Sequence, residues 1–290
     1  MGPPEGYMPA MSAADHTTGW PFMKMHGLGN DFVVVDGRAR AFDITPTLAQ
    51  AIAHRRFGVG FDQLAVIEPT RGPSAAAHLT FYNADGSLSA ACGNATRCIA
   101  RHLMTEQGVA ELALTTERGT LFARDAGGGL TSVNMGPPEL GWAEIPLAEE
   151  VDTLSLPIDG APVATGMGNP HCTFFVEDAE AVPLDTFGPR MEHHPLYPQR
   201  TNVQVAQVTG VDRLRMRVWE RGTGITLASG SSSCAVAVAA ARRGLTGRTV
   251  TLDLDGGTLA VDWREDGVWM TGPTSHVFSG TLPPEWLASL

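Results

Sequence analysis

Cys92 occupies a position at which a cysteine can transfer protons. It follows Ala91 and precedes Gly93 and Asn94, after which the sequence reads as a helix that stops near Gly108. A thiolate at a helix N-terminus is stabilised by the aligned peptide dipoles and by free N–H groups. Taken alone, a free cysteine is more often a small buried residue, so the surrounding pattern decides whether Cys92 is a candidate acid or base.

A second turn of the same kind lies in the C-terminal part of the chain. There Ala228-Ser229-Gly230-Ser231 leads into a helical stretch that stops near Gly244. If the two helix starts face each other, a carboxylate can bind between them, with an acid/base group on each face of its α-carbon. Removing a proton from one face and returning one to the other inverts a stereocentre. The two turns therefore predict proton transfer at a single carbon by Cys92 and Ser229.

Polar landmarks recur at equal spacings in the two parts of the chain, as expected for an internal repeat. One pair in each part is separated by 33 positions and another by 9, namely Asn30–Gln63 with Asn169–Asn202, and Asn83–Cys92 with Glu220–Ser229. The segment Gly27-Leu28-Gly29-Asn30 is matched by Gly166-Met167-Gly168-Asn169. Two homologous halves are predicted, each placing polar residues at one location. Together with Arg221, these residues can hydrogen-bond a second amino-acid head group.

Short apolar and β-branched runs surround the two helical stretches and read as strands. They include 32–35, 64–67, 203–208, 214–219 and 250–254. The predicted fold class is α+β: two pseudo-symmetric domains, each a strand-rich, barrel-like sheet wrapped around a central helix. Periodicity alone does not separate this fold from a general α/β arrangement. The predicted division is a disordered leader at 1–21, an N-terminal half at 22–135 to which 275–290 return, and a C-terminal half at 136–274.

Composition excludes several classes of function. The formal net charge is -11 and the basic residues are scattered, which argues against a nucleic-acid partner. No run approaches the roughly 18 consecutive apolar residues that a membrane-spanning helix needs. The four cysteines show no CxxC spacing, and no secretory signal is recognisable, so we expect free thiols and a cytoplasmic location.

Cofactor chemistry is not expected. Lys24 is the only lysine, and a pyridoxal-phosphate enzyme needs a lysine for its Schiff base. The pair His193-His194 has no further ligands at metal-binding spacing, so it reads as a surface turn and no metal is predicted. Amino-acid chemistry is therefore expected to proceed without a cofactor, on a small-molecule substrate.

Several segments resemble diaminopimelate epimerases, and the resemblance runs from about Met23 to Val277. The matching segments are 23–32, 83–87, 92–98, 168–172 and 220–224. Similarity to this family implies two pseudo-symmetric domains with the active site in the cleft between them, and a homodimer. It also implies interconversion of LL- and meso-diaminopimelate for lysine and peptidoglycan synthesis by two-base proton transfer.

The resemblance also implies roles for individual residues. It makes Cys92 one proton-transfer group, and it gives His171 a supporting role. Substrate contacts are assigned to Asn30, Gln63, Asn83, Gly93, Asn94, Asn169, Asn202, Glu220, Arg221, Gly230 and Ser231.

The main departure from the family pattern is Ser229, which stands where the second catalytic cysteine is expected. A hydroxyl is a far weaker acid than a thiol, whose reference pKa is about 8.5. Three explanations are open: Ser229 acts with help from Glu220 or from water; it is an engineered replacement that traps substrate; or the site runs a one-base isomerisation or dehydration of an amino acid or hydroxyamino acid. A binding protein that lost turnover is a further alternative.

Overall fold

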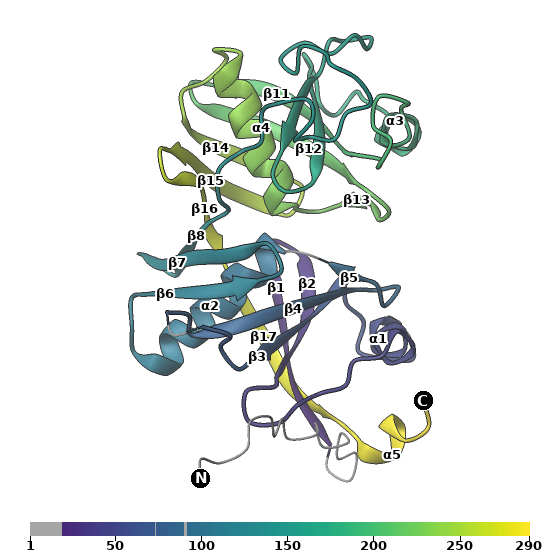
Figure 1. The fold of residues 1–290 in the computed structure, drawn as a ribbon, viewed down its shortest axis with the longest axis vertical. Coiled ribbons are helices and arrows are strands. Elements are labelled where there is room, and N and C mark those ends of the chain that lie inside the picture. The colour runs from purple at the N-terminus through teal and green to yellow at the C-terminus, as the bar shows by residue number, and fades with distance from the viewer. Residues whose placement is uncertain (1–18, 73, 90–91) are drawn as a thin grey trace, which may run out of the picture.

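The computed structural model describes residues 19–72, 74–89 and 92–290, and it divides into two halves that lie one above the other in Figure 1. Most of the leader predicted at 1–21 lies outside these residues. Its last two positions do not belong to a leader, because Trp20 and Pro21 pair with Leu282 and Thr281 in a β-ladder. Trp20 is fully buried against Phe42, so the fold starts before the position that composition suggests.

The first half contains a ladder of strands and two helices. Its elements are β1 (Trp20–Gly27), β2 (Asn30–Asp36), α1 (Pro46–Ala53), β3 (Gln63–Glu68), β4 (Ala77–Asn83), β5 (Leu88–Ser89), α2 (Gly93–Gln107), β6 (Glu111–Thr116), β7 (Gly119–Gly127) and β8 (Leu130–Asn134). Pairs β2–β3 and β4–β6 are parallel, and the other neighbours are antiparallel.

The second half repeats this order strand for strand. Its elements are β9 (Val163–Gly166), β10 (Pro170–Phe175), α3 (Leu184–Glu192), β11 (Asn202–Gly210), β12 (Arg213–Glu220), β13 (Gly224–Thr226), α4 (Gly230–Arg242), β14 (Thr249–Leu254), β15 (Gly257–Arg264) and β16 (Gly267–Pro273). Again the second and third strands are parallel, β10–β11, and so are β12–β14. The two halves predicted from equal spacings are therefore confirmed as a structural repeat.

The halves are joined into one sheet by their last strands, because β8 pairs antiparallel with β16. After β16 the chain crosses back, and β17 (Ser275–Leu282) pairs with β1 before the short α5 (Pro284–Leu287). The exact division into domains at residues 135 and 274 stays a prediction. The consequence for the site is that both central helices are held by one connected sheet.

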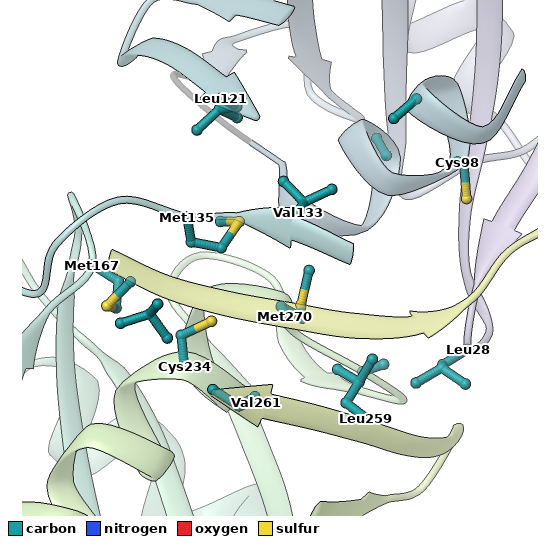
Figure 2. Packing of buried hydrophobic residues seen from close by; sticks show 14 of the residues in the cluster. Leu28, Cys98, Leu121, Val133, Met135, Met167, Cys234, Leu259, Val261 and Met270 are labelled. Carbon is teal, nitrogen blue, oxygen red and sulfur yellow. The ribbon is translucent and has the colours of Figure 1, made fainter. Parts of the chain in front are cut away.

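Each half packs its strands around one helix, α2 or α4. Strand β14 alternates buried residues with exposed or half-buried ones, so one face of its sheet meets the core. Within helix α4, residues 234–240 are apolar and all buried, so this helix is enclosed by its surroundings. One hydrophobic cluster includes residues of both helices. Figure 2 shows Met270 on β16 among side chains from the two halves, with Met135 above this strand and Cys234 below it in the view.

Candidate active site

Cys92 and Ser229 are the N-cap residues of α2 and α4, and the two helix starts lie next to each other. A Cβ atom added to Gly93 would lie 3.1 Å from the Met270 methyl carbon, and one added to Gly230 would lie at the same distance. The side-chain amide of Asn94, on α2, donates to the carbonyl oxygen of Ala228 at 3.5 Å. Glycine at both positions therefore lets two helix N-termini converge on one region.

A cavity of about 740 Å³ lies at these helix starts and takes side chains from both halves. It brings together the residues predicted from the sequence, namely Asn30, Gln63, Asn83, Cys92, Gly93, Asn94, Asn169, Asn202, Glu220, Arg221, Ser229, Gly230 and Ser231. His171 is fully buried behind the cavity and does not line it. Figure 1 shows α2 and α4 in separate halves, so the cavity lies where the halves meet.

Ser229 is hydrogen-bonded to a carboxylate. Its hydroxyl donates to Glu220 Oε2 at 2.8 Å and makes no cap bond to its own helix. Thr226 donates to the other carboxylate oxygen at 2.6 Å. Burial raises the pKa of Glu220, and the two hydroxyl donors partly offset that rise. Ser229 therefore has a base in direct contact, which a hydroxyl needs in order to accept a proton from carbon.

The surroundings of Cys92 favour the protonated form of its thiol. Burial raises the pKa of its thiol to about 12, although backbone N–H groups of Ala95 and Asn94 lower it and the nearby Glu220 charge raises it further. Its sulfur accepts from Ala95 N at 3.4 Å. The thiolate stabilisation expected from the helix start is therefore opposed by desolvation, which is the larger influence on the pKa of this thiol. In its protonated form Cys92 can donate a proton.

His171 holds one cavity residue in place. Burial, followed by the charges of Arg221 and Arg118, lowers the pKa of His171 to about 3, so the ring is neutral. Its Nδ1 lies 3.0 Å from the Gln204 amide nitrogen and must accept. Its Nε2 then carries the proton and donates to Asn169 Oδ1 at 2.9 Å. The Asn169 amide is thereby oriented with its oxygen toward His171.

Two residues that line the cavity, Asp62 and Arg118, were not predicted from the sequence. Asp62 accepts from the Asn30 amide at 2.9 Å and binds Arg55. Arg118 lines the cavity and donates to the carbonyl oxygen of Met167. Asp62 directly precedes Gln63, so its position beside a predicted contact was the available signal. For Arg118, on the turn between β6 and β7, no local pattern exists.

Neither a metal site nor a membrane-spanning helix is found in the part of the chain that the structure describes. Within residues 19–72, 74–89 and 92–290, no group of three or more His, Cys, Asp or Glu side chains is placed to hold a metal ion. In the same ranges, none of the helices has the length and apolar character needed to cross a membrane. All four cysteines are free, and three of them are buried.

Sequence comparison matches residues 22–141 and 163–277 to the family model described as Diaminopimelate epimerase. A relative with that name from Rhodospirillum centenum is 53% identical over 266 residues, covering 90% of this chain and 91% of the relative. Another, from Acidiphilium cryptum, is 51% identical over 273 residues, covering 92% and 98%.

Structural comparison finds the same fold in more distant proteins. A hydroxyproline epimerase from Agrobacterium vitis has a TM-score of 0.67 at 14% identity, covering 91% of this chain and 92% of the other. A protein described as a predicted epimerase, from Pseudomonas aeruginosa, has a TM-score of 0.66 at 20% identity, covering 91% and 99%. The predicted α+β fold of two similar halves is thereby confirmed.

Proposed function

The chain belongs to the diaminopimelate epimerase family, and from that premise we propose that it interconverts LL- and meso-diaminopimelate without a cofactor. The observation that carries the proposal is the convergence of Cys92 and Ser229 on one cavity from two neighbouring helix starts. A carboxylate bound at those N–H groups has its α-carbon between the two side chains.

The proposed mechanism uses a carboxylate base on one face and a thiol acid on the other. Ser229 Oγ accepts the α-proton as its own proton passes to Glu220 Oε2, which it already contacts at 2.8 Å. The carbon then accepts a proton from Cys92 Sγ on the opposite face, and a thiolate remains. In the reverse direction the Cys92 thiolate removes the proton and Glu220 returns one through Ser229. A weak acid such as Ser229 can take part because the proton ends on Glu220, so that no serine alkoxide remains.

The distal end of the substrate is proposed to bind among the polar residues of the second half. Arg221 lines the cavity, and its backbone N–H donates to Asn202 Oδ1 at 3.0 Å. The Asn202 amide nitrogen donates to the carbonyl oxygen of Pro170 at 3.0 Å. These bonds fix Asn202 and leave the Arg221 side chain near the cavity, where a guanidinium can bind a second carboxylate.

A direct assay tests this function. Pure protein incubated with LL-diaminopimelate is expected to produce the meso isomer with no added cofactor, and the meso isomer is expected to produce LL-diaminopimelate. Chromatographic separation of the stereoisomers measures both directions. Failure to convert either isomer contradicts the proposal.

We further propose that two copies of the chain associate. Strand β17 pairs with β1 on one side, and no second ladder to it is found among the described residues. It exposes Val277 and Phe278, which retain 56% and 47% of their accessible surface. Apolar side chains on a free strand edge favour pairing with another chain.

Sedimentation tests this association. The wild type is expected to show about twice the monomer mass of 30.7 kDa, and Phe278→Arg is expected to give monomers. A monomeric wild type contradicts this proposal.

A cytoplasmic location is also proposed. It is supported by four free cysteines, which a reducing compartment preserves. Cell fractionation tests it, and recovery of the protein outside the cytoplasm contradicts it.

A further inference from the structure

Arg97 is a fully buried arginine on α2, one turn below the cavity. Its side chain has no exposed surface. Two glycines make room for the guanidinium group: a Cβ atom at Gly27 would lie 2.7 Å from Arg97 Nη2, and one at Gly272 would lie 3.4 Å from Arg97 Cζ. The slot that holds this side chain is therefore built from β1, α2 and β16 together.

The guanidinium of Arg97 has no acidic partner among the described residues. Its Nη1 donates to Asn94 Oδ1 at 3.1 Å and contacts Met270 Sδ at 3.5 Å, and its Nε donates to the carbonyl oxygen of Pro273 at 3.3 Å. Within the described part of the chain, Nη2 has no hydrogen-bond partner. A buried cation without a counter-ion is unfavourable. A negatively charged group of the substrate, bound nearby, would supply the missing counter-charge and lower this unfavourable electrostatic energy.

Asn94 connects Arg97 to the cavity. Because its amide oxygen accepts from Arg97, its amide nitrogen must face the other way. That nitrogen donates to Asn30 Oδ1 at 3.1 Å and to the carbonyl oxygen of Ala228 at 3.5 Å. Asn94, Asn30 and the residue after Ala228 all line the cavity. In the other half His171 has a similar effect on Asn169, because its ring N–H donates to the amide oxygen of Asn169 and so orients that amide.

We propose that Arg97 is a positioning residue that acts through Asn94 and provides the counter-charge for the α-carboxylate of the substrate. The carboxylate binds at the N-termini of α2 and α4, where Gly93 and Gly230 leave space, and the positive charge of Arg97 lies directly behind Asn94. The identity of the ligand rests on the proposed function. The Arg97 side chain does not touch the ligand or the transferred proton.

The test compares two ligands on neutral variants of Arg97. Arg97→Met removes the charge, while Arg97→Gln also keeps an amide donor for Asn94 and serves if the first variant does not fold. Arg101→Met is the matched control, since Arg101 lies one turn further on α2 and pairs with Asp125 at 2.7 Å. Calorimetry measures Kd for meso-diaminopimelate and for its monoamide, in which the carboxylate at the reacting carbon is a carboxamide.

Loss of the charge is expected to weaken the carboxylate ligand selectively. For Arg97→Met and Arg97→Gln, Kd for diaminopimelate should rise about tenfold or more, while Kd for the monoamide should change by less than about twofold. Arg97→Lys should restore most of the selectivity, and Arg101→Met should leave both constants unchanged.

A purely structural Arg97 would weaken the binding of both ligands equally or of neither, and either result overturns the inference. If the wild type binds diaminopimelate and the ratio does not move, only the role of Arg97 fails; if the wild type does not bind diaminopimelate, the proposed function fails with it.

Discussion

Cys92→Ala is expected to lower kcat by about three orders of magnitude in both directions, since a positioned acid or base contributes up to about 10⁴-fold. The thiol is the proton donor on one face in one direction, and its thiolate is the base in the other. Alanine can do neither. Steady-state rates with both stereoisomers measure the loss, and circular dichroism checks that the variant is folded.

Cys98→Ala is the matched control for this prediction. Cys98 lies on the same helix but is buried in the hydrophobic cluster and does not line the cavity. The same chemical change there is expected to leave kcat close to that of the wild type. Substantial turnover by Cys92→Ala, or an equal loss in the two variants, would contradict the role of the Cys92 thiol.

Glu220→Gln is expected to lower kcat by a comparable factor, about 10²-fold to 10⁴-fold. The substitution preserves the shape of the side chain and can still hydrogen-bond Ser229, but it removes the group on which the proton ends. Ser229→Ala should show a similar loss because the relay is interrupted. If Glu220→Gln keeps wild-type kcat, the relay is excluded.

Two further variants separate a relay from a purely structural Glu220. Thr226→Val removes a donor that stabilises the charged carboxylate, so the pKa of Glu220 should rise. In the direction in which Glu220 accepts the proton, the carboxylate must be ionised, so wild-type activity in that direction should fall as the pH drops through this pKa. The variant should lose that activity at a higher pH. An unchanged pH profile in Thr226→Val argues against Glu220 as the base.

Ser229→Cys should raise the rate, because a thiol is a stronger acid than a hydroxyl.

The sequence predicts the residues of the cavity well because the chain repeats itself. Asn30 and Asn169 each precede a polar residue by 33 positions, and two copies of one fold must place such residues at equivalent points. The same reasoning predicts the central helices, since a small-residue turn and a distant glycine bracket each of them. Helix α2 indeed ends at Gly108, which has a left-handed conformation with φ of 66°.

The electrostatic properties of the site were not accessible from the sequence. A helix start suggests an acidic thiol at Cys92, yet desolvation of the thiol decides the sign of the pKa shift. Similarly, Arg97 reads as an ordinary helix residue, and only its slot between Gly27 and Gly272 distinguishes it. The partners of Ser229 depend on the turn of β12 into β13, which brings Thr226 and Glu220 together. Such properties arise from contacts that span the sequence.

The central claim is that protons are exchanged on both faces of a single carbon, and hydrogen exchange in deuterium oxide tests it most directly. LL-diaminopimelate incubated with the protein should yield meso isomer that carries deuterium at the inverted carbon, and the meso isomer should yield deuterated LL-diaminopimelate. Mass spectrometry of the separated isomers measures both. Exchange into one isomer without interconversion would indicate a single base, exchange into neither would indicate binding alone, and either result would contradict the account.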